Sequence, residues 1–497
     1  MRQALHIFLK DVRLLWAEVL ASLAVAAVFT ATLSRGAGSG SSYPATGNVA
    51  SELLTYLLPL TWFTLIARAI YNEALPGDRQ FWVTRPYDWR SLLLAKALFI
   101  AAFVNLPKLV SDAVIIHAYG FGIAPETAGL LWNQLLLTAA FVLPLAAICT
   151  VTSGLTQLLS VTFLLGLAAV AWNLVIPELS SGASWLRLEW VRTYSAGIVA
   201  ALAAAFIILL QYRRRATLAS RWLAAAAALL VLAAVAWLPW RAAFALQSRF
   251  AAQQAAGAGV RLVCDADSRS AVRVLFDGSD VMELRIPLRI TGASQTLLSR
   301  VDGIAATIEG PQGTTRWKGR QPWSQVLSDD TSTWFRARLE GPVYRRLRDV
   351  PVRIRGTVYL TLYGNERRTF VPRRTEGMLH DTPGMGLCSF TQAGTTCLLN
   401  CRSAFRPRPD LVSIEFAGNE GQGNLVGFRN LFESRNASES YAPFPAEPEM
   451  VPVTLSTWHS DVRRPVSGAM VRAIEPVAHI RRDFEVTGLR LAEHEVR

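Results

Sequence analysis

Lysine is nearly absent from this chain of 497 residues. It occurs only at Lys10, Lys96, Lys108 and Lys318, so almost all of the 50 basic residues are arginines. None of the four lysines follows a glycine, whereas a phosphate-binding loop needs Gly-Lys followed by Ser or Thr. The chain therefore lacks the loop through which such ATPases hold nucleotide.

The sequence also lacks the common signatures of catalysis and of nucleic-acid binding. It contains no His-Glu-x-x-His and no Gly-x-Ser-x-Gly. The net charge of +13 is not accompanied by zinc-finger spacing, an RNA-binding signature or a basic recognition helix. We therefore expect no enzyme activity, no cofactor and no nucleic-acid partner, with the basic surface solvated or near anionic lipid.

Long apolar runs occur only in the first half of the chain. Runs of about 20 apolar residues match the hydrocarbon thickness of a bilayer, and in lipid each must be a helix. The seven candidate spans are residues 14–33, 51–71, 91–118, 129–152, 158–177, 193–211 and 222–240. This pattern predicts a transmembrane domain over 1–240, an Ala/Gln-rich stem over 241–259 and a separate water-exposed domain over 260–497.

The first sixteen residues mix charged residues with apolar ones. Leu5, Phe8, Leu9 and Val12 recur at helical spacing, which predicts an amphipathic helix in the membrane interface before the first span. No small-residue cleavage site follows, so this segment is not expected to be a cleaved signal peptide.

The basic residues near the spans predict an orientation. The N-terminal segment and the 72–90 and 212–221 connections are rich in Arg and Lys, whereas the 34–50 and 119–128 connections are poor in them. Basic loops stay in the cytoplasm. The 178–192 connection fits this alternation least well. With seven spans in a bacterial inner membrane, the N-terminus is then cytoplasmic and the C-terminal domain extracytoplasmic.

Cysteine usage agrees with that orientation. Cys149 lies in the fourth span, where a small apolar filler is expected. The other four, Cys264, Cys388, Cys397 and Cys401, fall in the expected outer domain, where an oxidising compartment allows two disulfides. We expect the pairs Cys388–Cys397 and Cys264–Cys401. A metal site is the alternative, but the Cys-x3-Cys spacing without a nearby His does not support it.

Ionisable residues within the spans are costly and are therefore functional candidates. Lys96 can extend to the cytoplasmic surface. Lys108 and Asp112 lie four residues apart on one helix face and can pair, and Pro107 beside them predicts a kink. The pair is either a self-neutralised structural feature or a polar lining of a substrate path.

Four further polar residues in the spans are better suited to hydrogen bonds between helices than to binding a substrate. They are Glu18, Asn133, Gln134 and Asn173.

The second half alternates apolar and polar residues in short runs separated by turn-forming clusters. The runs are 260–264, 271–276, 282–290, 303–309, 334–339, 352–362, 411–416 and 479–491. This spacing predicts an all-β, immunoglobulin-like sandwich, built as one enlarged unit or two.

The connection over 72–90 is too apolar for a solvated loop. Pro76-Gly77 predicts a turn, and Pro86 restricts the residue before it to extended geometry. A short amphipathic element under the membrane is expected. The residues of interest are Glu73, Gly77, Asp78, Arg79, Phe81, Trp82, Arg85, Pro86 and Arg90.

This connection resembles the cytoplasmic hairpin of the permease subunits of type 2 ABC transporters. The matching positions are Glu73, Gly77, Val83-Thr84-Arg85-Pro86, Arg90 and Leu93-Leu94-Ala95-Lys96. The likeness covers about residues 1–212. It implies that the hairpin is a coupling helix that contacts a separate ATP-binding subunit, and that two permeases assemble as a homodimer or heterodimer. A seventh span and a large outer domain depart from the family pattern.

The expected function is that of a permease subunit which moves substrate across the membrane while a separate chain hydrolyses ATP. The alternative is a membrane-anchored envelope receptor or assembly factor, in which the outer domain binds a partner and the helices are a scaffold.

Overall fold

The structure is a computed structural model in which the chain divides into two compact units. Unit 1 comprises Met1–Trp172, Tyr194–Val235 and Arg367–Ala473, and unit 2 comprises Asn173–Thr193, Ala236–Glu366 and Ile474–Arg497. Each unit is therefore built from separate stretches of sequence. The described residues are 2–36, 49–72, 88–179, 189–237, 240–251, 254–263, 272–276, 281–292, 297–311, 316–327, 332–373, 379–405, 411–418, 425–433, 453–461 and 466–495.

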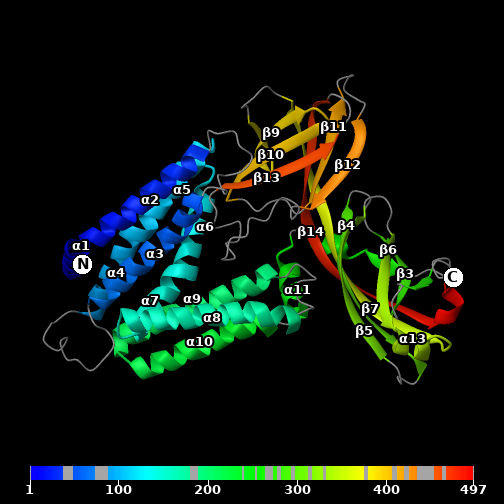
Figure 1. Ribbon diagram of the computed structural model, residues 1–497, viewed down its shortest axis with the longest axis horizontal. Helices are drawn as coiled ribbons and strands as arrows, with labels where there is room; N and C mark the ends of the chain where they lie inside the picture. Colours follow the sequence, from blue (N-terminus) through cyan, green and yellow to red (C-terminus); the bar gives the residue numbers. More distant parts are fainter. Residues whose placement is uncertain are drawn as a thin grey trace. The chain divides into compact units, whose positions relative to one another are not determined.

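The N-terminal half is helical, as the apolar runs predict (Figure 1). Its helices are α1 (Arg2–Leu14), α2 (Trp16–Gly36), α3 (Val49–Tyr71), α4 (Trp89–Ile100), α5 (Leu106–Ala118), α6 (Thr127–Leu137), α7 (Leu143–Val151), α8 (Leu155–Leu179), α9 (Glu189–Arg214) and α10 (Thr217–Trp237).

Six apolar helices among the described residues are long enough to cross a membrane. They cover Trp16–Arg35, Leu53–Tyr71, Trp89–Ala118, Thr127–Val151, Thr193–Arg214 and Thr217–Ala234. Apolar side chains on them, such as Leu202 and Leu229, are exposed. Those exposed groups suit a lipid environment, so the chain is a multi-pass membrane protein. The remaining expected span, over 158–177, falls in α8, whose apolar stretch Leu155–Ala168 is shorter, and it stays a prediction.

Two of the spans contain a π-helical turn. The turn η3 (Ala101–Asn105) joins α4 to α5, and η4 (Thr138–Val142) joins α6 to α7. Pro107 and Pro144 each lie in the first turn of the helix that follows. A proline inside a helix lacks the N–H for an i→i−4 bond, and its ring clashes with the carbonyl one turn earlier. The kink predicted at Pro107 therefore takes the form of a wider turn just before the proline.

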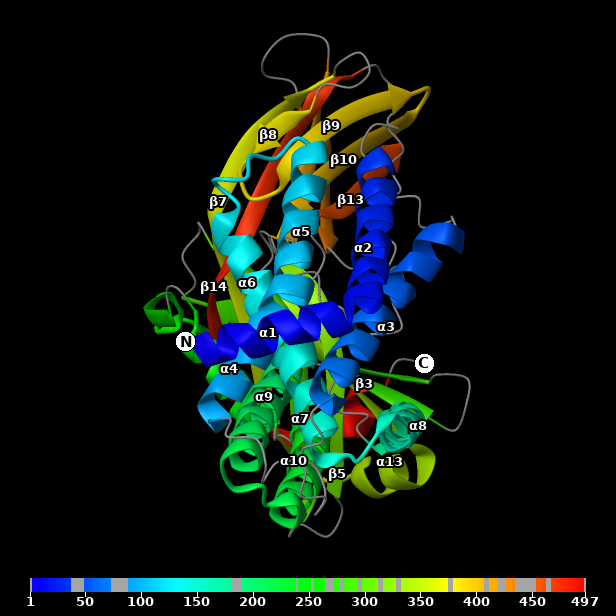
Figure 2. The ribbon, with the colours of Figure 1, turned by 90° about the vertical axis from the view of Figure 1, so that its left-hand side faces the viewer.

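Helix α1 is amphipathic, as predicted from residues 1–16, and one face of it is buried. Ala4 and Ile7 belong to the same core as the span helices, while Leu5 and Leu9 on α1 are exposed. Figure 2 shows α1 lying across the long axes of α2 and α5. This arrangement suits a helix at the membrane surface, with one face on the bundle and another toward lipid.

The C-terminal half is rich in antiparallel sheets. Its strands are β1 (Arg261–Val263), β2 (Arg273–Phe276), β3 (Val281–Thr291), β4 (Leu298–Glu309), β5 (Arg316–Leu327), β6 (Ser332–Glu340), β7 (Val352–Pro372), β8 (His380–Thr382), β9 (Gly386–Ala393), β10 (Thr396–Ala404), β11 (Leu411–Gly418), β12 (Leu425–Glu433), β13 (Val453–Asp461) and β14 (Val466–Leu489).

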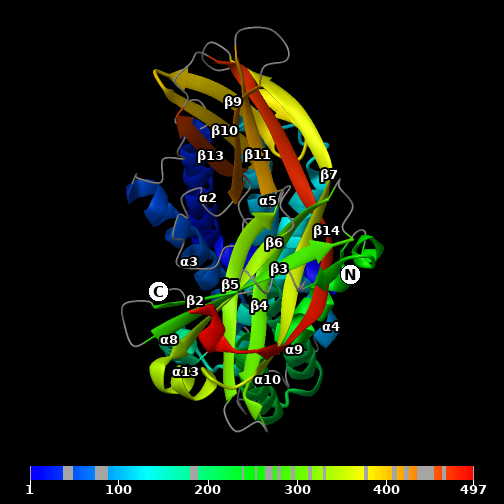
Figure 3. The same ribbon diagram turned by 90° about the vertical axis from the view of Figure 1, so that its right-hand side faces the viewer.

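The strands that the structure describes form three sheets. One has the order β1-β3-β2 with β6 also paired to β3, the second has the order β13-β10-β9-β8, and the third has the order β12-β11-β14-β7-β4-β5. Figure 3 shows β7 and β14 running side by side, with β4 and β5 beyond β7. Buried side chains of β3, β4, β6, β7 and β14 form the core of unit 2.

Short α-helices accompany the strands in the described part of this half. They are α11 (Trp240–Arg249), at the start of the predicted stem, and α13 (Gly341–Leu347) between β6 and β7. Phe244 of α11 packs edge-on against Tyr359 of β7, with the ring centroids 4.9 Å apart. The first half of the stem is therefore a helix that covers part of a sheet face in unit 2.

The disulfide found in the structure differs from both expected pairs. Cys388 of β9 is bonded to Cys401 of β10, its direct partner in the strand register. The predicted pairs Cys388–Cys397 and Cys264–Cys401 are therefore wrong. The reason is the register: Cys397 of β10 lies opposite Gln392, four residues from the bonded cysteine. Cys264 lies outside the described residues, and Cys149 is buried in α7, as expected.

Candidate functional site

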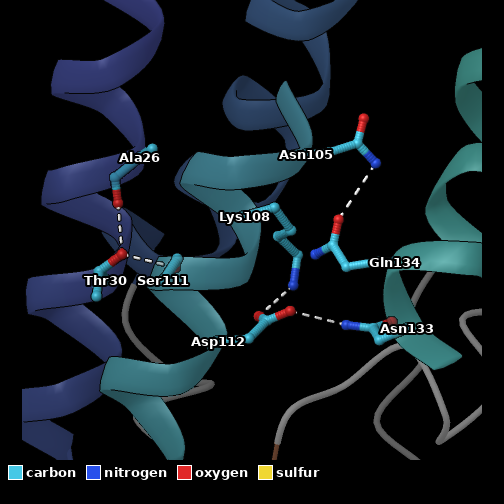
Figure 4. Close-up of polar contacts among 8 residues, drawn as sticks. All are labelled: Ala26, Thr30, Asn105, Lys108, Ser111, Asp112, Asn133 and Gln134. Carbon is cyan, nitrogen blue, oxygen red and sulfur yellow. Dashed lines mark hydrogen bonds and ion pairs between the residues drawn. The ribbon is translucent and has the colours of Figure 1, made fainter. Parts of the chain in front are cut away.

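A cluster of polar side chains joins α5 to α6 inside the membrane-spanning part of unit 1 (Figure 4). The Lys108 ammonium forms an ion pair with Asp112 Oδ1, one helical turn along α5, as the spacing predicts. Asn133 Nδ2 of α6 donates to the other oxygen, Asp112 Oδ2, at 2.8 Å. The Asp112 side chain is fully buried. Both of its oxygens are thus compensated, one by a charge and one by an amide.

The two π-turns are directly linked beside this cluster. Asn105, the last residue of η3, donates through Nδ2 to Thr138 Oγ1, the first residue of η4, at 2.9 Å. The same amide lies 3.2 Å from Gln134 Oε1 (Figure 4). Turned by 180°, the Gln134 amide would instead donate to the Asn105 carbonyl and accept from the Leu109 N–H, so it contacts Asn105 of η3 in either orientation.

A third helix joins the cluster from the other side of α5. The hydroxyls of Thr30 on α2 and Ser111 on α5 lie 2.6 Å apart, and Thr30 Oγ1 also donates to the Ala26 carbonyl (Figure 4). Helices α2, α5 and α6 are therefore held together by polar groups that satisfy one another. In an apolar surrounding such bonds fix the helix register because the alternative is an unpaired polar group.

A second buried ion pair ties α1 to α4. Lys96 Nζ of α4 donates to Asp11 Oδ2 of α1 at 2.7 Å, and the two side chains are 3% and 0% exposed. The prediction that Lys96 extends to the cytoplasmic surface is therefore wrong: the ammonium turns to a carboxylate within the protein. The sequence argument missed Asp11 because it treated the first sixteen residues only as an interfacial helix.

Two further polar residues predicted in the spans are Glu18 and Asn173. Glu18 of α2 pairs with Arg68 of α3, with Nη2 and Oε1 3.1 Å apart, at a partly exposed position. Asn173 lies in α8, but its side chain is outside what the structure describes.

The predicted coupling hairpin lies almost wholly outside the described residues. Residues 73–87 are not described, so the positions of Glu73, Gly77, Asp78, Arg79, Phe81, Trp82, Arg85 and Pro86 stay predictions. Arg90 is described: it lies exposed in the first turn of α4, with its guanidinium 5.4 Å from the centroid of the Trp89 ring.

The polar cluster lies beside a contact with the β-rich part of unit 1. The Arg402 guanidinium of β10 lies 5.3 Å from the centroid of the Tyr119 ring, just after α5. Ala404 of β10 packs with Ile116 of α5 and Leu130 of α6 in one apolar cluster. Burial raises the pKa of Tyr119, and the Arg402 charge opposes part of that rise. The C-terminal end of α5 and the N-terminal end of α6 therefore contact strand β10 as well as each other.

The sequence pointed to Lys108, Asp112 and Asn133 but not to the link between the π-turns. A usable signal was present: Leu106-Pro107 and Leu143-Pro144 place the same dipeptide inside two neighbouring spans. A proline inside a helix leaves the carbonyl one turn earlier without its usual N–H partner. Nearby side chains can bond to such a backbone group, so polar residues close to these prolines are candidates for contacts between helices.

Acidic, histidine and cysteine side chains do not gather into a possible metal centre within the described part of the chain, where no group of three or more is present.

Comparison with known proteins does not extend these observations. No protein-family model matches the chain, and no curated protein sequence matches it. A solved structure similar in part is the transglutaminase of red sea bream, with 8% sequence identity and a TM-score of 0.13, over 44% of this chain and 30% of that chain. A TM-score this low does not indicate a common fold, so nothing about function is transferred from it.

Proposed function

We propose that this chain is the permease subunit of an ATP-driven transporter of the type 2 ABC class, with ATP hydrolysed by a separate subunit. The observation that carries the proposal is the buried Asp11–Lys96 pair. Lys96 lies six residues after Arg90, the last residue of the proposed coupling hairpin. A partner bound at 72–90 would thus act on a helix that is tied to α1, and both helices would move together.

The α5–α6 contact supplies the second part of the mechanism. In a π-turn each backbone hydrogen bond joins residues i and i+5 instead of i and i+4, and such turns are frequent at functional positions. Because Asn105 joins η3 to η4, a rotation of α4 would reach α6 through this bond. We propose that α4–η3–α5 transmits movement from the cytoplasmic side to the polar cluster, which lies beside the substrate path.

The β-rich half is proposed to be an extracytoplasmic, immunoglobulin-like domain. Its contact with α5 and α6 through Arg402 and Ala404 supports a role on the exit side of the path. A disulfide between Cys388 and Cys401 suits an oxidising compartment. In this proposal the N-terminus is cytoplasmic and α8 is a seventh span. An odd number of spans places the β-rich domain on the opposite side of the membrane.

The experiment is purification of the tagged chain from its own membranes, a search for a co-purifying ATP-binding subunit, and measurement of ATP turnover by the complex. We expect Arg85→Glu and Glu73→Lys in the hairpin to abolish both assembly and turnover. The matched control is Arg213→Glu, a charge reversal in the last turn of α9 at another end proposed to be cytoplasmic, which should leave assembly intact. Unchanged assembly and turnover in both hairpin variants would refute the proposal.

A further inference from the structure

We infer that unit 2 contains a binding site for a phospholipid, a function that holds whether or not the chain is a permease. The site is a groove of about 730 Å³ on the face of the sheet formed by β5, β4, β7 and β14. Part of this face is covered by α11, whose Phe244 packs on Tyr359, and the groove lies beside the start of that helix at Arg241. Figure 3 shows the strands of this face.

The floor of the groove is made of small side chains and its sides are basic. Thr307 of β4 lies directly between Lys318 of β5 and Arg355 of β7 in the strand register. Neighbouring strands are about 4.8 Å apart, so the backbones of Lys318 and Arg355 lie on either side of Thr307, roughly twice that distance from each other. A phosphate above Thr307 could accept from both cations.

The groove has an excess of positive charge. Its lining contains Arg241, Lys318, Arg355 and Arg481 against two carboxylates, Asp483 and Glu485. Both carboxylates already have partners: the Arg481 guanidinium lies 3.3 Å from Asp483, and Arg353 and Arg355 share Glu485.

Lys318 differs from the other cations of the groove. Like the others it is exposed, but unlike Arg355 and Arg481 it has no carboxylate partner among the residues that the structure describes. Its ammonium is therefore available to an anion. A partly enclosed cationic site of this kind attracts phosphate because the walls limit screening by water.

A smaller pocket adjoins the groove and is partly apolar. Its volume is about 240 Å³, and it shares Arg241 and Arg481 with the groove. Its other walls include Phe244 and Ala245 of α11 and Tyr359 of β7. A cationic groove beside an aromatic pocket matches an amphiphile, whose phosphate would lie in the groove and whose hydrocarbon would enter the pocket.

The position of α11 in the chain identifies the amphiphile as a membrane lipid. Arg241 follows Ala234, the last residue of a candidate span, by only seven residues. Seven residues reach at most about 25 Å, so the chain itself limits how far Arg241 can lie from the end of that span. Leu246 and Phe250, four residues apart at the end of α11, are exposed and suited to the membrane interface.

The test measures lipid binding by the full chain purified in detergent, with phosphatidylglycerol, phosphatidylcholine and soluble glycerol 3-phosphate as probes. We expect phosphatidylglycerol to bind more tightly than phosphatidylcholine. Lys318→Gln should weaken phosphatidylglycerol binding about fivefold, the usual effect of removing one basic group from an anionic headgroup. The control is Arg346→Gln on α13, an exposed arginine outside the groove, which should bind as the wild type does.

A second variant separates a lipid from a free phosphate ester. Ala245→Trp fills the apolar pocket and should weaken phosphatidylglycerol binding while glycerol 3-phosphate binding is unchanged. If its thermal unfolding shows a lost fold, Ser248→Phe at the same pocket replaces it.

Three results would overturn the inference: equal binding of the two lipids, no effect of Lys318→Gln, or an equal loss in Arg346→Gln. Glycerol 3-phosphate that binds as tightly as lipid, with no effect of the pocket variant, would assign the groove to a soluble phosphate ester instead.

Discussion

In the spans, Lys108, Asp112 and Asn133 satisfy one another away from water, whereas in the groove of unit 2 Lys318 faces solvent and Arg355 shares a carboxylate with a neighbour. The difference follows from the surroundings. A charge buried in an apolar medium is tolerated only with a close partner, while an exposed charge costs little when unpaired. The polar residues of the spans therefore hold helices together, whereas the cations of the groove are available to a ligand.

The largest effect is expected for Asp112→Leu, which leaves the mostly buried Lys108 ammonium without its carboxylate. Loss of one partner of a buried pair costs about 3–5 kcal/mol. Denaturation in mixed detergent micelles measures this loss. The double variant Lys108→Met with Asp112→Leu should recover most of it, since no charge remains. A double variant as unstable as the single one would contradict the self-neutralised pair.

The next effect tests the contact between α6 and β10. A Cβ atom on Gly129 would lie 2.5 Å from Cβ of Phe405, so Gly129→Leu must displace the strand or the helix. Overpacking of this kind costs about 1–3 kcal/mol. The control is Gly166→Leu in α8, where no atom lies within 4 Å of the added Cβ. Equal thermal stability of the two variants would show that β10 does not rest on α6.

A smaller effect is expected for Asn105→Leu, which removes the link between the two π-turns. Hydrogen bonds between membrane helices contribute about 0.6–2 kcal/mol. We expect a stability loss in that range and, in the assembled transporter, a fall in ATP turnover larger than the stability loss explains. A variant with normal turnover would separate the π-turns from the proposed transmission.

The smallest effect is expected for the exposed pair of Glu485 with Arg353. The hydrogen bond from Arg353 lowers the pKa of Glu485 below its ordinary value. A lowered folded-state pKa stabilises the fold above the unfolded pKa of about 4.3, and this contribution is lost as the pH falls through the folded pKa. Glu485→Gln should therefore lower the melting temperature slightly at pH 7, with the difference from wild type disappearing in acid. A difference that grows in acid would contradict this assignment.

The sequence predicted the helices better than the strands, for a physical reason. A span requires about 20 apolar residues in one run, and that signal survives without tertiary context. Strands β5, β9, β10 and β12 were not expected because their alternation is broken by arginine, glycine or cysteine. The helix over Trp240–Arg249 was not expected, because its residues were assigned to a stem over 241–259, although its Phe244 packs on Tyr359.

Within the candidate site, pairs close in sequence were predictable and pairs between helices were not. Lys108 and Asp112 are four residues apart, so helical geometry alone brings them together. Asp11 and Lys96 are 85 residues apart, and their contact depends on how α1 packs on α4. The disulfide prediction was wrong for the same reason, because the pairing is set by the β9–β10 register rather than by the spacing of the cysteines in the sequence.

The most direct test of the account is the mass of the intact complex, measured by native mass spectrometry after purification of the tagged chain from its own membranes. The account predicts two copies of this 54.5 kDa chain, or one copy with a related permease, together with two copies of a separate ATP-binding subunit. A chain that purifies from those membranes without any ATP-binding subunit would contradict the account.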